Sequence, residues 1–173
     1  MDIETVFKKI SIRGRFAFGV KCIESYVSEN KIEIDSIDKL LTLLWEFTES
    51  ESLNLWDEKI SDLNPTNILG VEYEKFPNDF PTIDAAEYKE LKKIYQNLYK
   101  DLIKLISETI EIGTSNLYGG TGEYSSHSLK PTIEVYKITE KLLLKMPDVN
   151  SFIQFRFSEF NAWGNKIVKH NIE

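Results

Sequence analysis

The stretch "DAAEYKELKKIYQNLYKDLIKLISETIEI", residues 84–112, contains the clearest helical pattern in the chain. Asp84 and Glu87 have the spacing of a capping box at its start, and Gly113 stands where a left-handed C-cap is expected at its end. The pattern predicts one helix, which at about 1.5 Å per residue is roughly 40 Å long. The positions of its apolar face recur every three or four residues: Tyr88, Leu91, Tyr95, Leu98, Leu102, Leu105 and Thr109.

Four more apolar positions beside this face widen it beyond the narrow seam of a coiled coil, which favours a helix at the centre of a bundle. They are Tyr99, Ile103, Ile106 and Ile110. Residues 1–173 are therefore predicted to form an all-α fold, a single-domain helical bundle around one long central helix. Leu98 and Leu102 are expected to be buried in the middle of that helix.

The rest of the chain supplies shorter helical patterns and two irregular stretches. Helices are predicted over about 15–28, 35–47, 53–63 and 129–146, and the irregular stretches are 64–83 and the glycine-rich loop after Gly113. In "SFIQFRFSEF", residues 151–160, apolar residues alternate with polar ones. This alternation predicts a short extended C-terminal segment with one face against the bundle: Ile153, Phe155 and Phe157.

Length and composition are those of an ordinary folded domain, with 42% hydrophobic and 28% charged residues in 173. No stretch approaches the roughly 20 apolar residues that cross a bilayer, and the first nine residues lack an apolar signal core. Cys22 is the single cysteine, so no disulfide can form within the chain. We therefore expect a cytoplasmic protein with no membrane partner, and we expect Cys22 to be a buried thiol.

The net charge of −7 conceals an uneven distribution along the chain. Residues 24–90 hold 17 acidic residues against five lysines and no arginine, whereas the rest holds 11 acidic and 16 basic residues. Binding to nucleic acid requires clustered positive charge, so the middle segment cannot supply that contact. A basic protein partner is the better complement, and no nucleic-acid partner is expected.

The glycine-rich stretch "SNLYGGTGEYSSHSLKPT", residues 115–132, has three interpretations: a phosphate cradle, a catalytic histidine site or a connector. Its glycine-containing part "GGTGEYSSHS", residues 119–128, matches neither the dinucleotide-binding nor the P-loop spacing and lacks the lysine that would meet a phosphate. With only His127 and His170 in the chain, no histidine metal cluster can form. A connector is therefore favoured, with no metal and no cofactor, while a small hydrolase or ligand-binding enzyme using His127 stays as the alternative.

The nine residues "EYEKFPNDF", 72–80, combine acidic and aromatic side chains in the second irregular stretch. Acidic residues speed the encounter with a basic partner, and buried aromatic residues provide affinity. The partner-binding residues predicted on this basis are Glu72, Glu74 and Asp79 for steering and Tyr73, Phe76 and Phe80 as anchors. The alternative is that the three aromatic residues hold the loop on the core while the acids face water.

Four segments, in order along the chain, resemble a loosely characterised bacterial family. They are "RGRFAFGVKCIESY" (13–26), "LLTLLWEFTESESLNLWDE" (40–58), "NLYGGTGEYSSHSL" (116–129) and "AWGN" (162–165). These segments are similar to small helical proteins found among the immunity-type proteins of bacterial toxin systems. The resemblance implies a cytoplasmic protein that neutralises a toxin by binding it, and it carries no catalytic signature.

Together these patterns favour a binding protein over an enzyme, specifically an immunity-type inhibitor that contacts a basic toxin domain. Two other classes stay open. One is the enzyme that uses His127, and the other is a structural subunit that forms a homo-oligomer through the helix over 84–112.

Overall fold

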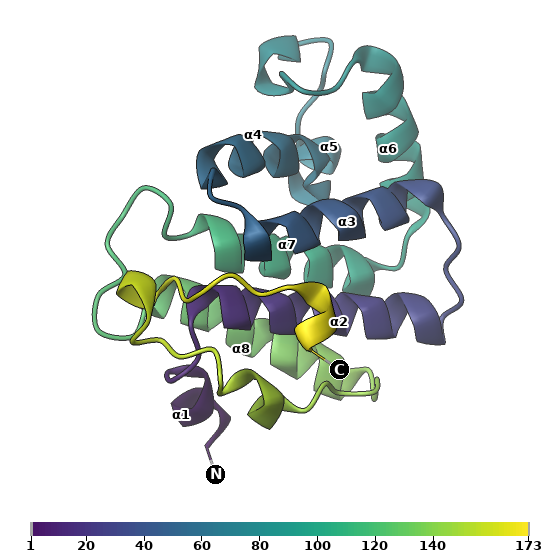
Figure 1. Ribbon diagram of the computed structural model, residues 1–173. Coiled ribbons are helices and arrows are strands. Elements are labelled where there is room, and N and C mark those ends of the chain that lie inside the picture. The colour runs from purple at the N-terminus through teal and green to yellow at the C-terminus, as the bar shows by residue number, and fades with distance from the viewer. Residues whose placement is uncertain (1, 173) are drawn as a thin grey trace.

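The structure, a computed structural model, describes residues 2–172 and consists of helices joined by turns (Figure 1). Within these residues no β-strand forms beyond one isolated antiparallel bridge between Ile10 and Arg156. The all-α class predicted from the sequence is therefore confirmed. The α-helices of the described chain are α1 (Ile3–Phe7), α2 (Ile12–Glu29), α3 (Asp35–Glu49), α4 (Leu53–Leu63), α5 (Pro65–Gly70), α6 (Ala85–Asn97), α7 (Lys100–Thr114) and α8 (Ser126–Lys141).

The central helix is α2 rather than the long helix predicted over 84–112. It packs against α3, α7 and α8, and its residues from Phe16 to Val20 are buried on every side. At Gly19 the backbone of α2 approaches α7 so closely that an added Cβ would lie 2.8 Å from Thr109 Oγ1. A helical stretch that is apolar on all sides, as α2 is from Phe16 to Val20, is expected at the centre of a bundle.

The predicted long helix is divided into α6 and α7, so this part of the prediction is wrong. Leu98 and Tyr99 have extended backbone angles, with ψ of 154° and 135°, and α6 ends before them. The three- and four-residue spacing of apolar residues continues across the break, because α6 and α7 bury the same face of the predicted helix. Each of the two helices packs that face against a different hydrophobic core. Leu98 is consequently only half-buried, whereas Leu102 is fully buried as predicted.

The two ends of the predicted helix have different outcomes. Asp84 does cap α6, accepting hydrogen bonds from the backbone N–H groups of Ala86 and Glu87 at 2.9 Å each. Gly113, in contrast, lies inside α7 and does not end it. Glycine is needed there for space, since a Cβ would lie about 3 Å from the rings of Phe16 and Phe47.

The molecule contains two separate hydrophobic cores. We call residues 64–97, comprising α5, the 3-10 turn η1 (Pro77–Asp79) and α6, the lobe, and the rest the body; the lobe projects at the top of Figure 1. The body core surrounds α2. The lobe core is smaller, is closed below by Ile37 of α3 and consists otherwise of Ile68, Phe80, Ile83, Tyr88, Leu91 and Tyr95.

Residues 64–83 are more ordered than the irregular stretch predicted there. Asn64 caps the short helix α5 by accepting a hydrogen bond from the Thr66 N–H at 3.0 Å. Asp62 then holds the far end of the segment, because its carboxylate accepts hydrogen bonds at 2.6 Å from both the backbone N–H and the hydroxyl of Thr82. Asp62 thus ties the lobe to the end of α4.

The predicted extended C-terminal segment is found only at the bridge residue Arg156, because its first residues belong to the 3-10 turn η2 (Val149–Phe152) and the residues on either side of Arg156 form turns and a bend. The predicted burial pattern is present. Ile153, Phe155 and Phe157 are half-buried and alternate with exposed residues. The Ser11 N–H donates to the Phe155 carbonyl, and the Phe157 N–H donates to the Lys9 carbonyl, at 2.8 Å each. These two hydrogen bonds hold the segment against the start of α2.

The chain then returns across the body through η3 (Phe160–Ala162) and ends in η4 (Lys169–Asn171), as the yellow segment of Figure 1 shows. We call residues 163–172 the C-terminal strap. Ile167 is fully buried, and its N–H donates to the Thr48 carbonyl at 3.0 Å while the Thr48 hydroxyl donates back to the Ile167 carbonyl at 2.6 Å. The strap is therefore fastened to the C-terminal half of α3.

Candidate protein-binding surface

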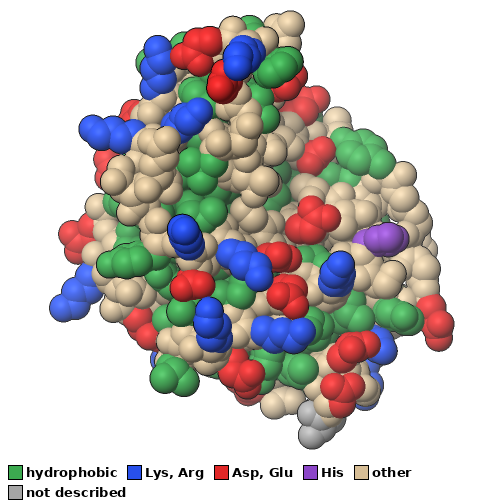
Figure 2. Space-filling view, turned by 180° about the vertical axis from the view of Figure 1, so that it is seen from behind, with side chains coloured by type: hydrophobic (Ala, Val, Ile, Leu, Met, Phe, Trp, Pro, Cys, Tyr) green, Lys and Arg blue, Asp and Glu red, His purple; other side chains and the backbone are tan. Residues whose placement is uncertain are grey.

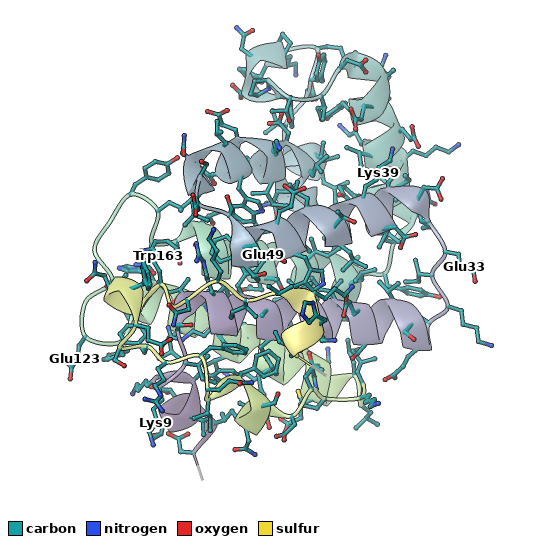
Figure 3. The ribbon with its side chains drawn as sticks, in the orientation of Figure 1. Lys9, Glu33, Lys39, Glu49, Glu123 and Trp163 are labelled. Atoms are coloured by element: carbon teal, nitrogen blue, oxygen red, sulfur yellow. The ribbon has the colours of Figure 1, made fainter. Side chains whose placement is uncertain are left out.

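The glycine-rich loop, residues 115–125, joins α7 to α8 at one edge of the body, and Glu123 projects outward from it (Figure 3). Gly122 has a φ of +59°, which favours glycine, and a side chain at Gly119 or Gly120 would meet no neighbouring atom. His127 is exposed on the first turn of α8 and makes no hydrogen bond or ion pair within the described chain. The geometry of the loop is that of a connector.

Arg15 holds this loop, and no pattern in the sequence indicates that role. Its guanidinium is fully buried on α2 and donates to the carbonyls of Phe7 (2.9 Å), Tyr124 (2.9 Å) and Ser125 (3.1 Å) and to the Ser128 hydroxyl (2.8 Å). No carboxylate takes part, and burial lowers the pKa of Arg15 to about 9. Each of the three guanidinium nitrogens donates a hydrogen bond within the protein, so Arg15 fixes the α8 end of the loop rather than offering a charge to a ligand.

Cys22 is buried as predicted, and burial raises the pKa of its thiol to about 12. A thiol with so high a pKa is a poor nucleophile at neutral pH. Among the described residues, no group of three or more His, Cys, Asp or Glu side chains is arranged to hold a metal ion. None of the described helices is both long enough and apolar enough to cross a membrane.

The structure separates the six partner-binding residues predicted in 72–80. Phe80 is 2% exposed in the lobe core, and the half-buried Tyr73 stacks on it with ring centroids 5.9 Å apart. In this conformation Phe80 is part of the core and cannot be an anchor, because its ring already packs against Tyr88. Phe76, at 53% exposed, is the aromatic side chain of the three that faces solvent.

The acids of this lobe surface are exposed, but two of the three are paired. Glu72 forms an ion pair with Lys75 at 2.5 Å, and Glu74 lies 3.8 Å from Lys89. Asp79 is exposed in η1 and forms no ion pair within the described residues. Neighbouring lysines therefore neutralise part of the field that these acids would present to a basic partner.

Most of the acidic excess lies elsewhere, in and around α3. Residues 24–63 hold 11 acidic residues and three lysines, whereas residues 64–90 hold six acidic residues and two lysines. On the opposite face of the molecule, basic and acidic side chains are intermingled (Figure 2). Glu134 of α8 contacts both Lys104 of α7 and Lys137.

An open groove of about 750 Å³ runs along the outer side of α3. Its acidic residues, Asp38, Glu46 and Glu49, form no ion pair within residues 2–172, unlike Glu72 and Glu74 on the lobe. Figure 3 shows Glu49 toward the C-terminal end of α3 and Lys39 toward its other end. The residues that line the groove are Asp38, Leu41, Thr42, Trp45, Glu46, Glu49, Ser50 and Lys169.

Trp45 lines this groove and is held by Glu24 of α2. The Trp45 indole N–H donates to the Glu24 carboxylate at 2.9 Å, which joins α3 to α2. Lys169 of the C-terminal strap lies with its ammonium 2.6 Å from Glu24 and 5.5 Å from the centre of the Trp45 ring. An aromatic face beside a carboxylate is a favourable position for a cation.

Part of this groove could have been found from the sequence. Asp38, Thr42, Glu46 and Glu49 recur every three or four residues on the polar side of the predicted helix over 35–47 and just beyond it. The placement of Lys169 had no such signal, because it depends on the path of the strap across the body. Polar faces of helices are common, so this pattern alone does not identify a binding surface.

Comparisons with known protein families, with curated protein sequences and with solved structures found no match to this chain. The resemblance to immunity-type proteins therefore stays a prediction.

Proposed function

We propose that this protein is an acidic, cytoplasmic binding protein, an immunity-type inhibitor that neutralises a basic toxin domain by direct contact. The observation that carries the proposal is the row of carboxylates on α3, where Asp38, Glu46 and Glu49 face an open groove without lysine or arginine partners in the described chain. The bacterial and toxin-directed part of the proposal rests on the sequence resemblance.

Unpaired carboxylates at a groove suit recognition of a cationic protein for two reasons. Their field attracts a basic partner from a distance and raises the association rate. In the complex they exchange water for ammonium or guanidinium groups, which supplies charge-assisted hydrogen bonds. The lobe surface around Phe76 stays a second candidate contact, with a weaker field because Glu72 and Glu74 are paired with lysines.

The test begins with the partner recovered from the native host and purified, and it measures whether this protein suppresses the partner's toxicity on co-expression. We expect growth to be restored by the wild-type chain and lost with the double variant Glu46→Lys/Glu49→Lys. The matched control is Glu111→Lys/Glu140→Lys, which makes the same change in charge at exposed positions of α7 and α8 and should still protect. Circular dichroism would verify that both variants fold.

Two results would contradict the proposal. One is a partner of neutral or acidic charge that binds with an association rate independent of salt. The other is a catalytic activity of this protein that disappears in His127→Ala, which would establish the enzyme alternative instead.

A further inference from the structure

The C-terminal end of α3 is locally unfavourable in electrostatic terms. Helix carbonyls leave a partial negative charge at a C-terminus, where basic residues are stabilising and acidic residues are destabilising. Helix α3 has Glu46 and Glu49 near this end and no basic residue in its last turn. The residues of α3 therefore leave a negative region at the end of the helix, and such a region attracts cations from other parts of a structure.

Three cations from other elements do converge on this region. Arg13 of α2 donates to the Ser50 carbonyl, Lys166 of the C-terminal strap pairs with Glu51, and Lys169 pairs with Glu24, at 2.6 Å in each case. The contact with Lys166 lowers the pKa of the Glu51 carboxyl. The chain thus satisfies its own negative region with basic side chains that come from α2 and from the strap.

Lys169 differs from the other two because it lines the groove itself. Its ammonium is held by the Trp45 face and by Glu24, and its side chain is 57% exposed. Exposed ion pairs and exposed cation–π contacts are individually weak, so this ammonium is exchangeable. We call the position between Trp45 and Glu24 the cation subsite.

We propose that the α3 groove binds a basic segment of the partner, and that a lysine or arginine of this segment displaces Lys169 from the cation subsite. The proposal rests on the proposed function and adds the chemistry of the contact. Asp38 and Glu49 are roughly 16 Å apart along α3 at about 1.5 Å per residue, about three turns. A partner helix with basic residues every three or four positions matches this spacing, and the apolar parts of Leu41 and Trp45 receive the stems of its long side chains.

The experiment uses a synthetic, end-capped peptide of repeated Lys-Ala-Ala-Lys units as the probe. Binding is followed by NMR through the Trp45 indole N–H, which lies at the subsite and is distinct from the indoles of Trp56 and Trp163 after assignment. We expect the Trp45 resonance to shift on titration. We expect Lys169→Ala to bind the peptide about threefold to tenfold more tightly than wild type, because the internal competitor is removed.

Lys166→Ala is the matched control, because it removes the same charge from the same strap but frees Glu51, which does not line the groove. It should change the affinity less than about twofold, as expected for an exposed charge pair. Equal effects of the two variants, or a Trp45 resonance that stays fixed while the peptide binds, would overturn the displacement of Lys169.

The double variant Glu46→Lys/Glu49→Lys distinguishes failure of the Lys169 displacement from failure of the proposed function. Loss of peptide and partner binding in Glu46→Lys/Glu49→Lys, with equal effects of the two strap variants, would overturn the displacement alone. Full binding of the recovered partner by Glu46→Lys/Glu49→Lys would overturn the groove as the binding surface and the displacement with it.

Discussion

The body and the lobe both bury aromatic residues in their cores, but the acids of the lobe surface and those of the α3 groove differ in their ion pairing. In the lobe the aromatic residues form the core, with Tyr73, Phe80 and Tyr88 in mutual contact, and nearby lysines pair with Glu72 and Glu74. In the body, aliphatic and aromatic residues on α2 and its neighbours form the core. The α3 acids Glu46 and Glu49 form no ion pair within residues 2–172.

This difference shows why composition alone points to the wrong surface. The segment 72–80 has the residues of an interface, yet its small lobe must use large side chains to bury enough area for stability. Helix α3 does not depend on its outer side chains for stability in this way. Its apolar side is buried by α2, and its other side carries charged residues that the core does not require. The surface available for binding is the one whose side chains are not used in the core or in ion pairs.

The largest expected effect is on the free energy of unfolding, and it distinguishes a residue deep in the body core from one at the boundary between the body and the lobe. Leu102→Ala should lower the free energy of unfolding by about 2–5 kcal/mol, because Leu102 is fully buried in the body core. Leu98→Ala, at the half-buried break between α6 and α7, should cost about 1 kcal/mol. Urea unfolding measures both, and equal losses would show that the break buries Leu98 as deeply as a continuous helix would.

A smaller effect tests how the lobe is held together. The Tyr88 hydroxyl lies within hydrogen-bond distance of the Ile68 carbonyl (3.1 Å) and also contacts the Val71 carbonyl. Tyr88→Phe should therefore cost about 1–2 kcal/mol. Native-state hydrogen exchange should show faster exchange in α5 and α6 than in α2, because the lobe can open locally. An increase of equal size in α2 would mean that the two cores unfold as one unit.

The smallest expected effect concerns the exposed aromatic residue of the lobe. Phe76→Ala should change the free energy of unfolding by less than about 0.5 kcal/mol, because Phe76 is 53% exposed. Thermal unfolding measured by calorimetry is sufficient to check this. A loss above about 1 kcal/mol would place Phe76 in the lobe core with Tyr73 and Phe80, and would remove it from the candidate contacts.

The sequence predicted helices correctly where one apolar face repeats, and it failed where two cores share that face. The periodicity of 84–112 is continuous, and nothing at Leu98 or Tyr99, neither proline nor glycine, indicates a break. The break follows from tertiary packing, because α6 turns to cover the lobe core while α7 lies against α2. Asp84 as an N-cap was predictable because capping depends on local residues only.

Of the candidate site, only the excess of negative charge could be predicted from the sequence. The acidic excess of residues 24–90 is visible in the sequence, but pairing decides which acids are free, and pairing depends on the folded structure. Lys89 reaches Glu74 from α6, and Lys169 reaches Glu24 from the far end of the chain. Arg15 was missed for the same reason, since its partners come from α1 and the glycine-rich loop.

The central claim is that the unpaired acids of α3, rather than the paired acids of the lobe, bind the basic partner. The most direct test is the association rate with the purified partner, compared between Glu46→Lys/Glu49→Lys and Glu72→Lys/Glu74→Lys at two salt concentrations. The α3 variant should associate about tenfold or more slowly than wild type at low salt, with the difference shrinking as salt screens it. The association rate of the lobe variant should be within about threefold of the wild-type rate, because charge reversal there changes acids that lysines already neutralise. A slower association of the lobe variant than of the α3 variant, or rates that do not depend on salt, would contradict the claim.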